Sequence, residues 1–183
     1  MKKRILSILL AVLMLLSALP LGMVDTAYAA ETSGVAAQSY YVASGKCGDS
    51  ATWTLDSTGT LTISGTGRMT NFTKDAPAPW ADQADQITTV EVEGTVTSVG
   101  ATAFKDCTAL TTVNIADGVE YIEAGAFNGC TALTEVNIPL SVGYIKTGAF
   151  KGCTALTSVT IRDDCRLDMN VFPDTVEVNH AEG

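Results

Sequence analysis

The chain has 183 residues and a formal net charge of −9, from 11 basic and 20 acidic side chains. This length suffices for one domain of ordinary size. An acidic surface repels the phosphate backbone of nucleic acids and is not attracted to anionic lipid, so the composition argues against both as partners. Solubility is the interpretation of the charge that we favour.

The first 29 residues have the pattern of a secretory signal peptide. Residues 2–4 are basic, and residues 5–19 form an almost unbroken apolar run that is short for a bilayer span of about 20 residues. Ala27 and Ala29 are small residues at the two positions that a signal peptidase reads. We therefore expect cleavage after Ala29 rather than an uncleaved anchor. The expected location is secreted or cell-surface, without membrane insertion once the signal is removed.

Two segments of different composition follow the signal. Residues 30–46 are rich in Ala, Ser, Gly and Thr, which predicts a flexible leader. Residues 47–80 predict a cap module, because apolar and polar residues alternate over two short runs separated by a turn signal at 56–59. The inward residues of these runs are Trp53, Leu55, Leu61 and Ile63. The runs predict a β-hairpin, which we expect to cover, with Trp80, the open end of the repeats that follow.

Residues 81–172 are built from a repeat of 23 residues. The residues that recur at this spacing are Phe104, Phe127 and Phe150, then Cys107, Cys130 and Cys153, then Leu110, Leu133 and Leu156. A degenerate unit precedes them, with Trp80 or a neighbour at the aromatic position, and Phe172 begins an incomplete last turn. A period of this size is typical of a solenoid. Residues 173–183 are then a C-terminal tail.

Each repeat unit predicts three short segments. Alternation over 110–115 predicts a strand whose Thr112 and Asn114 face solvent. A second apolar pair at 119–122 marks another extended segment, and 125–130 fit a tight turn followed by one helical turn. Stacked units cover the apolar faces of one another. The predicted fold is a β-rich solenoid of stacked coils with a parallel β-sheet face, short helical turns and an N-terminal hairpin cap.

The five cysteines after the signal are an odd number and follow the repeat. Cys107, Cys130 and Cys153 occupy equivalent positions on coils about 5 Å apart, which predicts a buried column of free thiols. Distance alone does not exclude a bond between neighbours in this column. Cys47 and Cys165 lie near opposite ends of the stack, too far apart for a bridge.

At these residues the chain resembles a known family. The pattern AFxxCTALTxVxI, followed by VxxI, resembles the BspA-type (Treponema pallidum-type) leucine-rich repeat of bacterial surface proteins. The preceding segment resembles the N-terminal module often found before such repeats, through Cys47-Gly48, Trp53-Thr54-Leu55, the run 59–67 and Pro79-Trp80. The resemblance implies a secreted or surface-attached protein with roles in adhesion, protein binding and host interaction. It implies no catalytic activity.

Candidate catalytic and metal-binding residues are few. His180, the single histidine, lies in the predicted tail, where disorder is more common than catalysis. The cysteines lack the Cys-x-x-Cys spacing of zinc sites. Asp163, Asp164 and Asp168 do not match an EF-hand loop, so a solvated turn is favoured over a weak calcium site. We predict no catalytic residues, no metal and no cofactor, and hence no enzyme.

Two surfaces remain as candidate ligand-binding sites. The first is the solvent face of the predicted strands, in two columns: Thr89, Thr112, Glu135 and Ser158, then Glu91, Asn114, Asn137 and Thr160. Exposed strand positions are polar in any case, so the architecture alone favours a recognition surface here. The second is Tyr121 and Tyr144, which either bind a partner or sugar or pack on each other. The leading hypothesis is a non-catalytic module that binds an extracellular protein or glycan; the alternative is a spacer of the cell envelope.

Overall fold

The computed structural model describes residues 39–181, and the residues from Tyr41 onward form one compact unit. The predicted signal peptide lies outside the described residues. The strands are β1 (Tyr41–Lys46), β2 (Gly48–Asp56), β3 (Thr60–Met69), β4 (Thr89–Val92), β5 (Val96–Val99), β6 (Thr112–Ile115), β7 (Tyr121–Ile122), β8 (Glu135–Asn137), β9 (Tyr144–Ile145), β10 (Ser158–Arg162), β11 (Arg166–Leu167) and β12 (Glu177–Ala181). A 3-10 helix spans Ala81–Gln83.

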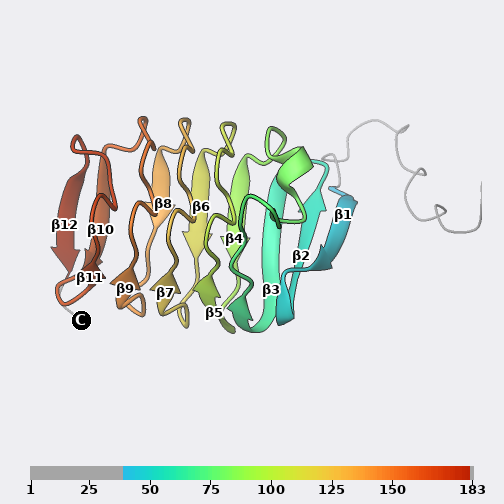
Figure 1. The fold of residues 1–183 in the computed structure, drawn as a ribbon, viewed down its shortest axis with the longest axis horizontal. Helices are drawn as coiled ribbons and strands as arrows, with labels where there is room; N and C mark the ends of the chain where they lie inside the picture. Colours follow the sequence, from blue (N-terminus) through green and yellow to red (C-terminus); the bar gives the residue numbers. More distant parts are fainter. Residues whose placement is uncertain (1–38, 182–183) are drawn as a thin grey trace, which may run out of the picture. The chain divides into compact units, whose positions relative to one another are not determined.

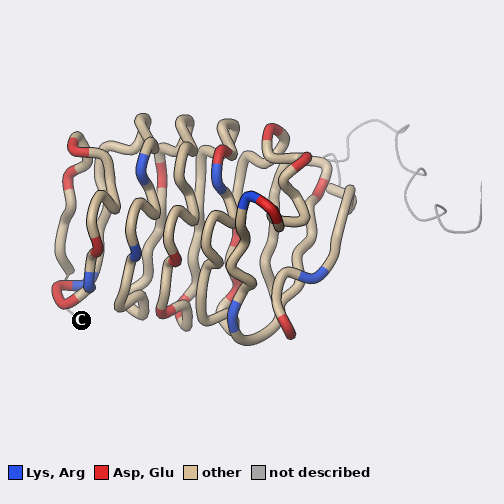
Figure 2. Tube along the Cα trace, in the orientation of Figure 1, with Lys and Arg blue, Asp and Glu red and all other residues tan. Residues whose placement is uncertain are grey.

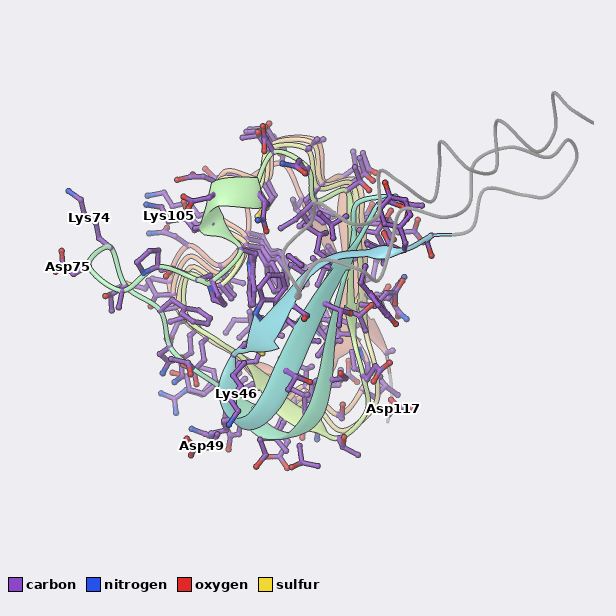
Figure 3. The ribbon with its side chains drawn as sticks, turned by 90° about the vertical axis from the view of Figure 1, so that its right-hand side faces the viewer. Lys46, Asp49, Lys74, Asp75, Lys105 and Asp117 are labelled. Carbon is purple, nitrogen blue, oxygen red and sulfur yellow. The ribbon has the colours of Figure 1, made fainter. Side chains whose placement is uncertain are left out.

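The strands stack in two parallel rows, which confirms the predicted solenoid. The first row is β4, β6 and β8, and the second is β5, β7, β9 and β11 (Figure 1). The register of the rows follows the repeat, since Val90 pairs with Val113 and Val99 with Ile122. Figure 3 looks along the stack: Lys74, Asp75 and Lys105 lie on one side, and Asp117 lies on another, where a corner joins the rows.

The predicted hairpin forms and caps both rows. Strands β2 and β3 are antiparallel, and Trp53 faces Ile63 across the pair. The first half of the long strand β3 pairs with β4, and its second half pairs with β5. One strand therefore covers the N-terminal edge of both rows, whose N–H and C=O groups would otherwise be unpaired.

The leader prediction is wrong for its last residues. Residues 41–46 form strand β1, which pairs antiparallel with β2 from Tyr41 opposite Asp56 to Lys46 opposite Thr52. This pairing satisfies the free edge of β2, which composition alone did not reveal. Gly45 lies so close to Trp53 that a Cβ there would be 2.9 Å from the indole Nε1.

An aromatic column runs through the interior from the cap to the last coil. Trp80 occupies the aromatic position of the degenerate unit, as the repeat alignment predicts. Successive rings from Trp80 through Phe104, Phe127 and Phe150 to Phe172 have centroids 5.3, 5.2, 5.1 and 5.2 Å apart. The first four of these residues are completely buried. Trp80 also donates its indole N–H to the carbonyl of Ala103, 2.8 Å away.

The segments between the rows are successive β-turns and not the expected helical turns. Within 102–107, alternate N–H groups bond locally and to the next coil: Lys105 donates to Thr102, whereas Phe104 donates to Ala126 at 2.8 Å. The equivalent residues Gly125 and Gly129 have φ of +62° and +80°. A helix requires negative φ throughout, so these positions exclude it and turn half of the N–H groups toward the neighbouring coil.

The C-terminal residues are more ordered than a tail. Strand β12 pairs in parallel with β10, so the coil structure continues to residue 181, and His180 lies opposite Ile161. Strands β10 and β12 form a separate two-stranded sheet, so the first row is interrupted after β8. Pro139, directly after β8, lacks the N–H that its equivalent Ala116 donates to Val92.

The cysteines occupy the predicted places. Cys107, Cys130 and Cys153 are completely or almost completely buried, and all five cysteines of the described chain are free. The thiols of Cys130 and Cys153 lie 3.1 and 3.2 Å from the carbonyls of Phe104 and Phe127 on the preceding coils. Burial, reinforced by the charge of Asp106, raises the pKa of the Cys107 thiol to about 12.

Candidate functional site

The polar columns of the first row are in register, as the repeat requires. Thr89, Thr112 and Glu135 pair in order, and so do Glu91, Asn114 and Asn137. Each side chain alternates with a buried valine or isoleucine, which places these columns on the outer face. Glu135 and Asn137 are exposed, whereas the residues of β4 and β6 are half-buried.

The second column carries the most structure of this face. The Asn114 Nδ2 group donates to the Glu91 carboxylate at 2.8 Å, which links β6 to β4. An open hollow of about 390 Å³ lies at the carboxyl ends of these strands, lined in part by Glu91, Glu93, Asn114 and Asn137. The hollow offers carboxylate and amide groups to a ligand.

The last members of the two predicted columns stand apart from the others. Ser158 and Thr160 lie on β10, in the separate sheet, where they face Glu177 and Asn179 of β12. All four side chains are exposed. The continuous recognition face therefore consists of β4, β6 and β8, and the β10–β12 pair extends it beyond an interruption.

The two tyrosines lie side by side on the second row, and a wider set of residues surrounds them. Tyr121 pairs with Tyr144, and the same column contains Ser98 before them and Arg166 after them. Arg68 pairs with Ser98 at its start. We call these five residues the tyrosine–arginine ladder.

Cations cover the rings of the ladder. The Arg68 guanidinium carbon is 4.9 Å from the centroid of Tyr121, and that of Arg166 is 4.7 Å from the centroid of Tyr144. These distances are within the range of a cation–π contact. Tyr144 also donates its hydroxyl to the Asp168 carboxylate at 2.6 Å, which raises the pKa of Tyr144 and lowers the pKa of Asp168.

The sequence pattern did not reveal the arginines of this ladder. A strict period of 23 places Leu167 opposite Tyr144, whereas the structure pairs Tyr144 with Arg166 because the last coil is one residue shorter. The signal was present in the spacing of Phe150 and Phe172, which is 22 residues. Arg68 lies in the cap, outside the repeat.

The acidic group after β10 is divided among separate partners. Asp164 forms an ion pair with Arg162, Asp168 accepts from Tyr144 and Thr147, and Asp163 lies 3.8 Å from His180. Across residues 39–181, no three His, Cys, Asp or Glu side chains gather closely enough to hold a metal ion. Within the same residues, no helix has the length and apolar character needed to span a bilayer.

Comparisons with known proteins agree with this architecture. Residues 82–181 match a family model described as a BspA-type leucine-rich repeat region, in six copies. No match was found among curated proteins.

Two solved structures from gut bacteria are similar to this chain in fold. One is a leucine-rich repeat protein from Eubacterium ventriosum, with 24% identity over 74% of this chain and a TM-score of 0.58. The other is a leucine-rich cell surface protein from Faecalibacterium prausnitzii, with 22% identity over 79% of this chain and a TM-score of 0.53. The chain spans 44% and 43% of their lengths, respectively.

Proposed function

Because the chain belongs to the BspA-type leucine-rich repeat family, we propose that it is a non-catalytic binding or adhesion module that works outside the bacterial cell. Proteins with this architecture commonly bind other proteins through extended faces of the stack. The predicted signal peptide supports an exported protein. The description of the Faecalibacterium relative as a cell surface protein supports the same location.

One observation carries the proposal: the register-locked polar face of β4, β6 and β8, with the hollow at its edge. The hydrogen bond between Asn114 and Glu91 and the alternating buried residues hold its side chains in place. Side chains held in advance lose less conformational entropy when a ligand binds. The ligand we expect is an extracellular protein or glycan.

The test compares two variants that add the same charge at different places. In the first variant, Asn114→Lys and Asn137→Lys fill the recognition face. In the control, Asn128→Lys and Thr131→Lys lie on the turn segments, where neighbouring coils already carry Lys105 and Lys151 at the position of Asn128. Purified proteins are screened against matrix proteins and cell-wall glycans by surface plasmon resonance.

We expect saturable binding that the first variant loses and the control keeps, with both variants folded by circular dichroism. Equal binding by the two variants would place the ligand elsewhere. A folded protein that binds none of the ligands would favour the alternative function, a spacer of the cell envelope.

A further inference from the structure

The tyrosine–arginine ladder holds its two arginines in fixed positions. Ser98 is the smallest member of the column and is 1% exposed. Arg68, its partner on β3, crosses this serine to reach the ring of Tyr121 on the strand beyond. Arg166 lies on the ring of its direct neighbour Tyr144. Each guanidinium is therefore held against an aromatic face.

These guanidinium groups have no acidic partner in a chain that is rich in acidic residues. Among the described residues, neither Arg68 nor Arg166 forms a side-chain hydrogen bond or an ion pair. By contrast, Arg162 pairs with Asp164 and Lys146 with Glu123. Asp168, the acid nearest to Arg166 in sequence, accepts hydrogen bonds from Tyr144 and Thr147. The planar N–H donors of both arginines are free to bind a carboxylate.

The surroundings make these two cations distinctive. Acidic side chains are distributed along the stack, with few basic ones among them (Figure 2). Four strand spacings of about 4.8 Å separate Arg68 from Arg166, so the two cations lie roughly 19 Å apart across the row. The edges of Tyr121 and Tyr144 lie between them. A ligand that contacts the whole ladder is therefore extended, runs across the strands and carries more than one negative charge.

The backbone of this row excludes one common mode of recognition. Strands β5, β7 and β9 each pair on both sides, so their backbone groups are already bonded within the sheet. A peptide lying across this face cannot add to it as a strand, and its amides would lose water without gaining partners. Sugar rings can pack against tyrosine while their hydroxyl groups stay in water.

We propose that the tyrosine–arginine ladder is a binding site for a carboxylated glycan, an extended oligosaccharide of uronic acids. Its carboxylates bind the guanidinium groups of Arg68 and Arg166, and its rings contact Tyr121 and Tyr144. This site goes beyond the proposed function and lies on the other row from Asn114 and Asn137. Each proposal can therefore fail without the other.

Isothermal titration calorimetry of the purified protein with a galacturonic acid hexamer tests the site. The matched ligand is the methyl ester of the same hexamer, which keeps the rings and removes the charge. The test variant combines Arg68→Gln and Arg166→Gln. The control is Arg162→Gln, which removes an arginine that Asp164 already engages.

The expected result is saturable binding that falls at least about tenfold for the ester and for the double variant, because two charge-assisted contacts are lost. The Arg162→Gln control keeps the affinity of the parent. A variant with lysine at both positions retains the charge without the planar donors, and we expect it to bind between the parent and the double glutamine variant.

Three results would overturn the proposal. The first is the absence of saturable hexamer binding by the folded parent protein. The second is equal affinity for the hexamer and its ester, or an equal loss in the control and the double variant. The third is tighter binding of a glutamate hexapeptide than of the galacturonate hexamer, which would assign the ladder to an acidic protein segment.

Discussion

Six equivalent residues of the turn segments have positive φ, and they set the path of the chain at this side of each coil. They are Thr102, Asp106, Gly125, Gly129, Gly148 and Gly152. Side chains are strained in this conformation, and the first unit carries that strain at Thr102 and Asp106. Glycine at the later positions removes it, so the two later coils turn with less strain than the first.

Replacing Gly125 isolates the cost of this backbone conformation. A Cβ at Gly125 would meet its nearest neighbours at 3.6 and 3.7 Å, which is ordinary contact, so the φ of +62° is the main obstacle. We expect Gly125→Ala to lower the free energy of unfolding by about 1–2 kcal/mol, measured by urea denaturation. Gly143→Ala is the control, because its φ is not positive and its nearest neighbour lies at 3.9 Å. A similar loss in both variants would contradict the explanation.

A buried carboxylate makes Lys146 important for stability. Glu123 is 5% exposed and forms an ion pair with Lys146 of the next coil. Lys146→Met leaves this carboxylate without its cation, and we expect a loss of about 1–3 kcal/mol in the free energy of unfolding. Adding Glu123→Gln should restore most of it. Losses that simply add in the double variant would show that the two side chains are not coupled.

At the scale of the element, the aromatic column joins the coils into one core. Phe127 is completely buried, and its ring lies 5.2 Å from Phe104 and 5.1 Å from Phe150. We expect Phe127→Ala to destabilise the chain by about 3–5 kcal/mol, since the cavity would lie between two rings. Thermal melting gives the comparison with Phe172→Ala, which truncates the half-buried end of the column. A smaller loss for Phe127→Ala than for Phe172→Ala would contradict this view of the core.

Strand β3 is the element that defines the start of the solenoid. It is antiparallel to β2 on one side and parallel to β4 and β5 on the other. The alternation of its apolar residues predicted a hairpin correctly. Its second role, as the first strand of both rows, depends on pairings with residues about 30 positions away, which no local pattern encodes.

At the scale of the whole molecule, the stack is nearly one-dimensional, because each coil contacts mainly its neighbours. The interruption between β8 and β10 removes one set of bonds between the last coils. The C-terminal coils should therefore open more often than the central ones. The cysteines report on this opening, because they lie at successive coils.

Thiol labelling with Ellman's reagent, read out by mass spectrometry, measures the order of opening. We expect half-buried Cys165 to react first, then Cys153, and Cys107 much later. The reagent needs a thiolate, and the raised pKa of Cys107 adds to its protection by burial. Equal rates for Cys107 and Cys153 would mean that the stack opens as a single cooperative unit.

The sequence by itself determined the period, the inward face and the cap hairpin. Each depends on alternation or recurrence along the chain, which requires only that apolar residues leave water. The columns of Asn114 with Asn137 and of Tyr121 with Tyr144 followed directly, because equal spacing places residues in register.

Only the tertiary structure decided the turn geometry, the strands at 41–46 and 177–181, and the arginines of the ladder. The turns depend on N–H groups that bond to the next coil, and both end strands depend on free edges of other strands. Arg166 reached its place through the loss of one residue in the last coil, and Arg68 through the reach of a long side chain over Ser98. These features follow from distances between coils, which a pattern along one coil does not contain.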